Sequence, residues 1–234
     1  MKKTVITSFL WILFVSFAFS QNGDHVDGGD FLKRIEYNMY AMRTAYNFDS
    51  KGDIEKLFFG DLNASVEFFY EPSFEASVNG PVGFRIVRDS LDASYVFEIK
   101  YISNYEDVYR KVWDRYRSMA NSDEKYKLVE KEQIKLFKVE TLSHPISDKF
   151  AEKLYKKMVS LIDNFKAKGV PPTIFDGYSV TFRTVVDDEV WSLKIHIPQG
   201  NALKMADICR QIMADDIETY TFKEAEYIKL LDAL

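Results

Sequence analysis

The chain has 234 residues, of which 47% are hydrophobic and 15% aromatic, and its formal net charge is −5. A chain this rich in apolar and aromatic residues can build a full core, so it is not expected to be a disordered protein. The mildly acidic balance argues against a nucleic-acid partner, because such a partner requires a clustered basic surface.

Residues 1–20 have the pattern of a cleavable secretory signal peptide. Two lysines precede an apolar stretch, and Ala18 and Ser20 place small residues at the two positions that a signal peptidase reads before Gln21. The apolar stretch is shorter than the roughly 20 residues of a membrane-spanning helix. We therefore expect cleavage between Ser20 and Gln21 and a periplasmic or secreted location. The alternative is an uncleaved membrane anchor.

The rest of the chain is expected to be a flexible tail, residues 21–29, followed by a single domain over residues 30–234. Cys209 is the only cysteine, so no intramolecular disulfide can form. In an exported chain this indicates a bacterial envelope or exterior setting, with a domain stabilised by its core. Because Cys209 lies in a helical pattern of apolar residues, we expect a buried thiol and no nucleophile.

The N-terminal half is predicted to combine helices with a β-meander. Apolar residues at helical spacing predict a helix over Asp30–Tyr46, and a short helical turn is expected over Ile54–Phe59. The capping box Ser103-x-x-Glu106 predicts the start of a further helix, which extends to about Met119. Alternating apolar residues predict the strands 66–70, 74–78, 82–86 and 95–101.

The C-terminal half begins with a charged segment, residues 121–132, that has no clear assignment. A long amphipathic helix over Ser147–Lys168 follows, and Gly169 and two prolines end it. The capping box Thr221-x-x-Glu224 predicts a terminal helix. The other expected elements are strands over 137–141, 180–186 and 191–197 and a helix over 201–216.

Two stretches of the chain, residues 79–104 and 176–201, resemble each other. Each has an Asn-Gly or Asp-Gly turn, a strand ending in Phe-Arg, an acidic turn, an aromatic-led strand and then a helix cap. We expect an α+β fold of antiparallel β-meanders packed with helices. The similarity fits two α-β-β-β-α halves, over 30–120 and 147–217. It also fits two unrelated β-meanders, because any two meanders have alternating apolar residues and similar turn residues.

The sequence contains none of the common catalytic or phosphate-binding motifs. The spacing of His25, His144 and His196 does not indicate a shared metal site. One acidic loop resembles a calcium loop, but Lys51 occupies the place of an oxygen ligand and Phe58 that of the closing glutamate. The sequence therefore predicts no catalytic residue, no metal site and no cofactor.

Arg85 and Arg183 occupy matching positions in the two similar stretches, and both are expected to point away from the core. Together with His196 they are the candidate residues for binding a protein or glycan partner. The alternative is an ordinary polar face, paired with Glu98 and Glu189 across the strands. If the alternation continues, the same outward faces also carry Arg88, Lys100 and Lys194.

Three stretches look like those of small exported proteins of Bacteroides-type gut bacteria. They are GFRIVRDSLDASYVFEIKYISN, HPISDKFAEKLYKKMVSLIDNFKAKGVPP and DGYSVTFRTVVDDEVWSLKIHIPQGNALKMADICRQI. The resemblance covers most of residues 60–215. That group is uncharacterised, so the resemblance implies export and one coherent domain, and it implies no activity.

These observations favour a non-catalytic binding or interaction protein of the bacterial envelope or exterior, with no stable membrane insertion after cleavage. An enzyme is not excluded, because a single sequence can hide a site assembled from distant residues. The alternative hypothesis is thus a hydrolase-type envelope enzyme that uses carboxylates such as Glu67, Glu71 and Glu75.

Overall fold

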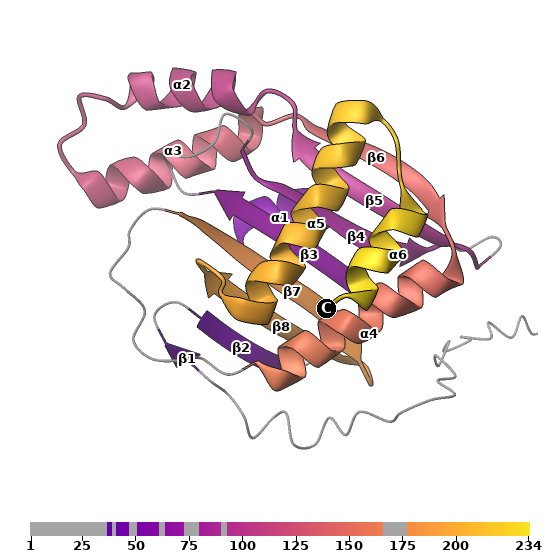
Figure 1. Cartoon of the computed structure of the whole chain (residues 1–234). Coiled ribbons are helices and arrows are strands. Elements are labelled where there is room, and N and C mark those ends of the chain that lie inside the picture. Colours follow the sequence, from indigo (N-terminus) through magenta and orange to yellow (C-terminus); the bar gives the residue numbers. More distant parts are fainter. Residues whose placement is uncertain are drawn as a thin grey trace, which may run out of the picture.

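Eight strands form one sheet in the spatial order β1-β2-β8-β7-β3-β4-β5-β6, and every neighbouring pair is antiparallel. The computed structural model describes residues 37–38, 41–46, 51–60, 64–72, 80–89, 93–165 and 177–234. Within these residues six helices accompany the sheet (Figure 1). The predicted α+β fold of antiparallel meanders with helices is confirmed.

The strands are β1 (Tyr37–Asn38), β2 (Ala41–Tyr46), β3 (Val66–Pro72), β4 (Val82–Arg88), β5 (Tyr95–Ile102), β6 (Val139–Ile146), β7 (Tyr178–Val186) and β8 (Glu189–His196). The helices are α1 (Asp53–Phe59), α2 (Tyr105–Arg115), α3 (Ser122–Leu136), α4 (Asp148–Asn164), α5 (Gly200–Thr219) and α6 (Glu224–Asp232).

Helices cover both faces of the sheet, so strand side chains are buried on both faces. Helices α4, α5 and α6 lie on one face, in front of the sheet in Figure 1, and form the larger core with it. Helices α1, α2 and α3 form a second, smaller core with the opposite face. The second core consists of Phe58, Phe59, Phe69, Ile102, Val108, Val112, Val129 and Phe137.

Strand β3 lies between the two similar stretches and pairs with both of them. Phe68 of β3 is opposite Phe84 of β4 on one side and Phe182 of β7 on the other. Their ring centroids are 5.5 and 5.3 Å from that of Phe68, and all three side chains are fully buried. Burial of each such ring stabilises the fold by roughly 1.5–3 kcal/mol. The two Phe-Arg motifs therefore occupy equivalent places beside one central strand.

The similarity of the two stretches is limited to their hairpins. The helix that follows the first hairpin, α2, packs on the smaller core, whereas the helix that follows the second, α5, packs on the larger one. The two helices therefore lie on opposite faces of the same sheet.

The predicted helix over Asp30–Tyr46 is wrong over residues 37–38 and 41–46, which form β1 and β2. Residues Ala41–Tyr46 pair with β8, from Ala41 opposite Ile195 to Tyr46 opposite Val190. This pairing gives hydrogen-bond partners to the backbone groups along the edge of β8. The free energy gained from these bonds outweighs the preference for a helix that the spacing of the apolar residues predicts. Residues 30–36 lie outside the described part of the chain, as do the predicted strand 74–78 and Gly169.

Neither predicted capping box starts its helix, whereas α4 begins with a side-chain cap. Ser147 caps α4 and accepts a hydrogen bond from the backbone N–H of Phe150 at 3.2 Å. The capping boxes at Ser103 and Thr221 are wrong, because Asn104 and Lys223 are the N-caps of α2 and α6. The Ser103 hydroxyl instead donates to the Lys138 carbonyl, and the carboxylate of Glu224 accepts from Ser147, so these groups make tertiary contacts.

Cys209 is buried in the larger core, as predicted. Its surroundings are apolar, and burial raises the pKa of its thiol far above the ordinary value. The thiolate is the reactive form of cysteine, so the folded protein holds this side chain in an inert state.

We expect Cys209 to resist thiol reagents in the folded protein and to react at the rate of a free cysteine in denaturant. Labelling with a chromogenic disulfide reagent across a urea series measures this, and the labelled fraction should follow the loss of circular dichroism. Rapid labelling without urea would contradict the buried position.

Candidate functional site

A row of alternating charges crosses four strands on the sheet face that α1 covers. Arg183 of β7 and Arg85 of β4 both lie opposite Glu67 of β3, and Arg85 lies opposite Glu98 of β5. The prediction that the two arginines occupy matching positions on one face is therefore confirmed. Glu67 between them was considered only as a catalytic carboxylate, because the sequence does not reveal that β3 separates the two hairpins.

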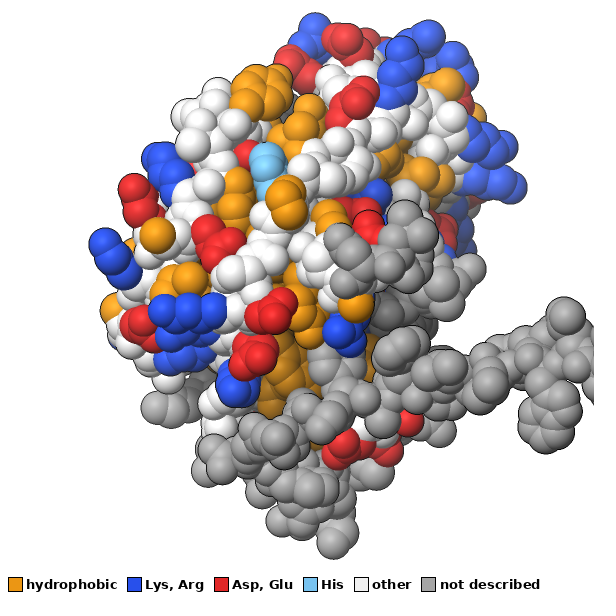
Figure 2. All heavy atoms as spheres, turned by 90° about the vertical axis from the view of Figure 1, so that its right-hand side faces the viewer, with side chains coloured by type: hydrophobic (Ala, Val, Ile, Leu, Met, Phe, Trp, Pro, Cys, Tyr) orange, Lys and Arg blue, Asp and Glu red, His pale blue; other side chains and the backbone are white. Residues whose placement is uncertain are grey.

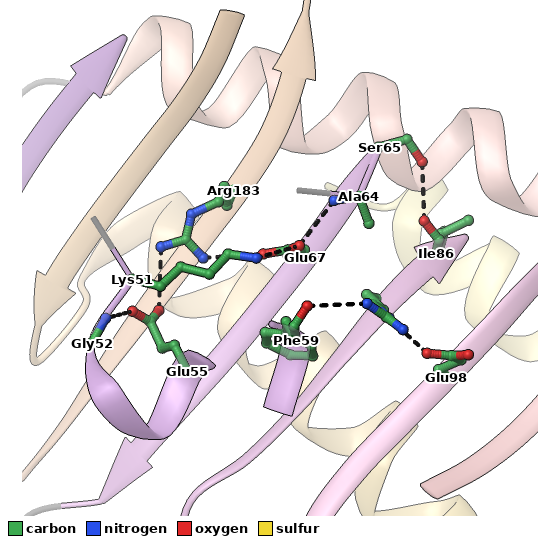
Figure 3. A network of polar contacts seen from close by, with 11 residues as sticks. Lys51, Gly52, Glu55, Phe59, Ala64, Ser65, Glu67, Ile86, Glu98 and Arg183 are labelled. Atoms are coloured by element: carbon green, nitrogen blue, oxygen red, sulfur yellow. Dashed lines mark hydrogen bonds and ion pairs between the residues drawn. The ribbon is translucent and has the colours of Figure 1, made fainter. Parts of the chain in front are cut away.

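Glu67 is the centre of the buried part of this row (Figure 3). Its Oε1 accepts hydrogen bonds from Lys51 Nζ and from the backbone N–H of Ala64, each at 2.9 Å. Its Oε2 accepts from Arg183 Nη1 at 3.2 Å. Both oxygens are thus occupied, and two cations neutralise the carboxylate.

Glu55 completes this network from α1, the helix that covers this face of the sheet. Its Oε1 accepts from Arg183 Nη2 at 3.4 Å, and its Oε2 accepts from the backbone N–H of Gly52 at 2.9 Å. Lys51, Glu55, Glu67 and Arg183 together form what we call the buried charge network, and all four are buried. Burial lowers the pKa of Lys51, and the charge of Glu67 opposes this shift.

Arg183 is therefore not the exposed residue that the sequence predicted. Its side chain is only 2% exposed, because residues 51–59 cover it. Gly83 of β4 lets this segment approach closely, since a Cβ at Gly83 would lie 2.8 Å from the ring of Phe59. A ligand in solution cannot reach Arg183, whose function in this structure is to balance two buried carboxylates.

Arg85 lies at the half-buried end of the charged row. Its Nε donates to Glu98 Oε2 at 2.6 Å, and its Nη1 donates to the Phe59 carbonyl at 3.3 Å. The alternative of a polar face paired across the strands is thus confirmed for Arg85 and Glu98. It is wrong for Arg183, which pairs with Glu67 and Glu55 and not with Glu189.

The face predicted for Arg88 is also wrong. It shares its side of β4 with Phe84 and Ile86, which belong to the larger core. Its guanidinium extends beyond that core, where Nε donates to the Ala93 carbonyl at 2.9 Å. The strand alternation therefore puts Arg88 on the opposite face from Arg85.

His196 lies at the end of the same sheet face, beyond the cover of α1. Glu71 of β3, Ser179 of β7 and His196 of β8 follow one another in a single cross-strand row. Ser179 Oγ lies 3.2 Å from His196 Nδ1. Lys194 Nζ lies 3.8 Å from Glu71 Oε2, and these two side chains are 49% and 41% exposed. We call Glu71, Ser179, Lys194 and His196 the open polar patch.

The electrostatics of the open polar patch are those of a partly desolvated ion pair. Burial raises the pKa of Glu71, and the positive charge of Lys194 opposes this rise. A partner that covers the patch would remove more water from both groups and strengthen their interactions. Lys194 and His196 were predicted for this face, whereas Ser179 was missed because its place depends on the register of β7.

The patch does not have the order of a catalytic triad. In a triad the histidine lies between the hydroxyl and the carboxylate, whereas here Ser179 lies between Glu71 and His196. Glu67 is fully engaged by Lys51 and Arg183, and Glu75 lies outside the described residues.

Among the described side chains, no group of three or more His, Cys, Asp or Glu residues is placed to hold a metal ion. None of the helices in the described part of the chain is both long enough and apolar enough to cross a membrane. The comparisons with known proteins found no matching family model, no matching curated protein and no matching solved structure.

We expect Arg183→Met to lower the free energy of unfolding by about 3–5 kcal/mol, because it leaves two buried carboxylates with one cation. Arg85→Met is the matched control, since Arg85 is half-buried and its loss should cost only about 1 kcal/mol. Urea unfolding followed by circular dichroism measures both. Equal losses for the two variants would contradict the central position of Arg183.

Proposed function

We propose that this chain is an exported, non-catalytic binding protein whose open polar patch contacts a protein partner in the bacterial envelope or exterior. Export is supported by the signal-peptide pattern of residues 1–20, with Ser20 and Gln21 at the cleavage point. These residues lie outside the described part of the chain. The single, buried Cys209 suits an exported domain that is stabilised by its core.

The observation that carries the proposed binding function is the exposed ion pair of Glu71 and Lys194 beside Ser179 and His196. The patch presents an anion, a cation, a hydroxyl and an imidazole on three adjacent strands. Protein surfaces carry complementary groups of both charge signs, and complementary charges set the register and specificity of an interface. A protein partner therefore fits the patch better than a uniformly charged polymer.

The rigid base of the patch supports the same proposal. Glu71 follows Glu67 by four residues on β3, and Ser179 precedes Arg183 by four residues on β7. The buried charge network thus fixes two of the three strands that carry the patch. Preorganised groups lose less conformational entropy on binding, so a few polar contacts contribute more affinity.

The export proposal predicts that the mature protein begins at Gln21. Mass spectrometry of the protein recovered from periplasm and culture medium measures its N-terminus and shows which of the two compartments contains it. An intact Met1 on the exported protein would contradict cleavage.

The binding proposal predicts that replacing Glu71 and Lys194 together by alanine removes the partner. The measurement uses the mature chain as bait in cross-linked envelope and medium fractions, with quantitative mass spectrometry of the captured proteins. We expect at least a tenfold loss of one specific protein. Stability should change little, because an exposed ion pair contributes only about 0–1 kcal/mol.

The matched control replaces Glu106 and Arg110, an exposed ion pair on α2, by alanine. This variant should capture the partner as well as the wild type does. If the Glu71/Lys194 variant captures the same proteins in the same amounts, the patch is not the binding surface.

A further inference from the structure

A buried carboxylate holds a histidine at the opposite side of the sheet. His144 lies on β6, the strand that ends the sheet, and its Nε2 is 2.8 Å from Oδ2 of Asp216 on α5. The Asp216 side chain is 0% exposed, and its Oδ1 has no hydrogen-bond partner among the described residues. Buried carboxylates are costly, so a half-satisfied one at the surface end of a helix requires an explanation.

The contact with Asp216 fixes how His144 faces the solvent. Because a carboxylate accepts, His144 Nε2 carries the hydrogen of this bond, and Nδ1 is the nitrogen that remains. The ring also stacks on Phe222, with centroids 5.3 Å apart and an angle of 11° between the planes. His144 is 27% exposed, and its contacts with Asp216 and Phe222 hold the ring so that Nδ1 can hydrogen-bond a ligand.

Tyr220, at the end of α5, is the second unusual residue of this region. Its backbone is left-handed, with φ 52° and ψ 34°, and its side chain is 75% exposed. Helices usually place glycine or asparagine at such a position, because a side chain there is strained. Strained residues that remain exposed gather at functional sites. Tyr220 gains no burial that would offset its strain, so its ring is a candidate contact for a ligand.

Tyr101 and Glu140 connect these groups into one surface. They are opposite each other on β5 and β6. Tyr220 lies one turn of α5 beyond Asp216, and its backbone N–H donates to the Asp216 carbonyl at 2.8 Å. Burial raises the pKa of Tyr101, and Tyr220 and Glu140 add to this rise. The hydroxyl of Ser103, which donates to the Lys138 carbonyl, also lies 3.3 Å from Glu140 Oε1. Figure 2 shows the side of the molecule on which β6 and α6 lie, with one histidine exposed beside hydrophobic side chains.

We propose that Tyr220, His144 and Glu140 form a binding site for a neutral carbohydrate at the β6 side of the sheet. An apolar sugar face stacks on Tyr220, while sugar hydroxyls hydrogen-bond to His144 Nδ1 and donate to the Glu140 carboxylate. Asp216 is a positioning residue that orients His144. The site faces α4, α5 and α6, so it is separate from the open polar patch and does not depend on it.

The chemistry of the site favours this ligand over two others. An anionic ligand would be repelled by Glu140. A peptide that adds a strand to β6 would meet Pro145, which has no N–H to donate. A neutral sugar needs an aromatic surface and fixed polar groups for its hydroxyls, and these are the groups that the site presents.

The test is a glycan array of neutral and acidic oligosaccharides, followed by calorimetric titration of the strongest neutral binder into the wild type and variants. Tyr220→Gly should lower the affinity at least tenfold while the melting temperature stays equal or rises, because glycine removes the backbone strain. His144→Gln should also weaken binding at least tenfold, since its amide can donate to Asp216 but places no nitrogen at the position of Nδ1.

Tyr126→Ala is the matched control, because Tyr126 is also an exposed tyrosine, 53% accessible, but lies on α3. It should bind the sugar with wild-type affinity. The proposal is overturned if the wild type retains no neutral glycan, if it retains only acidic ones, or if Tyr220→Gly binds as tightly as the wild type.

Discussion

Glu67 is a buried carboxylate in the central strand of the sheet, and the rest of the second face depends on how its charge is balanced. Moving one carboxylate from water to a protein interior costs on the order of several kcal/mol. Lys51 and Arg183 offset this cost, one from the segment before α1 and the other from β7. Residues 51–59 cannot leave the sheet without exposing this network to water or leaving charges unpaired. The charge of one glutamate thus holds α1 in place.

Glu67 and Phe68 are adjacent in the sequence and point to opposite faces. Phe68 contacts Phe84 and Phe182 in the larger core, and Glu67 lies between Arg85 and Arg183. A register shift of one residue would put the charge among the rings and a ring among the charges. The central strand therefore fixes the register of both neighbouring hairpins, and through them the rows that carry the proposed sites.

The spacing of apolar residues along the sequence correctly predicted the elements whose form depends on residues that are close together in the chain. The alternating strands of both hairpins and the amphipathic helix after Ser147 are of this kind. The burial of Arg183 could not be predicted, because its partners Glu67 and Glu55 are 116 and 128 residues away in the chain. Strand β2 was predicted as a helix because its partner, β8, is even farther away in the sequence. His144 was examined as a metal ligand, and its place beside Asp216 depends on how α5 packs.

The two proposed sites share one physical arrangement, in which a buried carboxylate fixes the strand or side chain that presents the exposed groups. Glu67 anchors β3 and β7 beneath Glu71 and Ser179, and Asp216 anchors the ring of His144. Each buried charge costs stability, and apolar residues of similar volume would stabilise the fold at least as well. Such groups persist where they improve the position of others, because a binding site needs side chains fixed before the ligand arrives. The strained backbone of Tyr220 follows the same logic, since glycine would be more stable there but would present no ring.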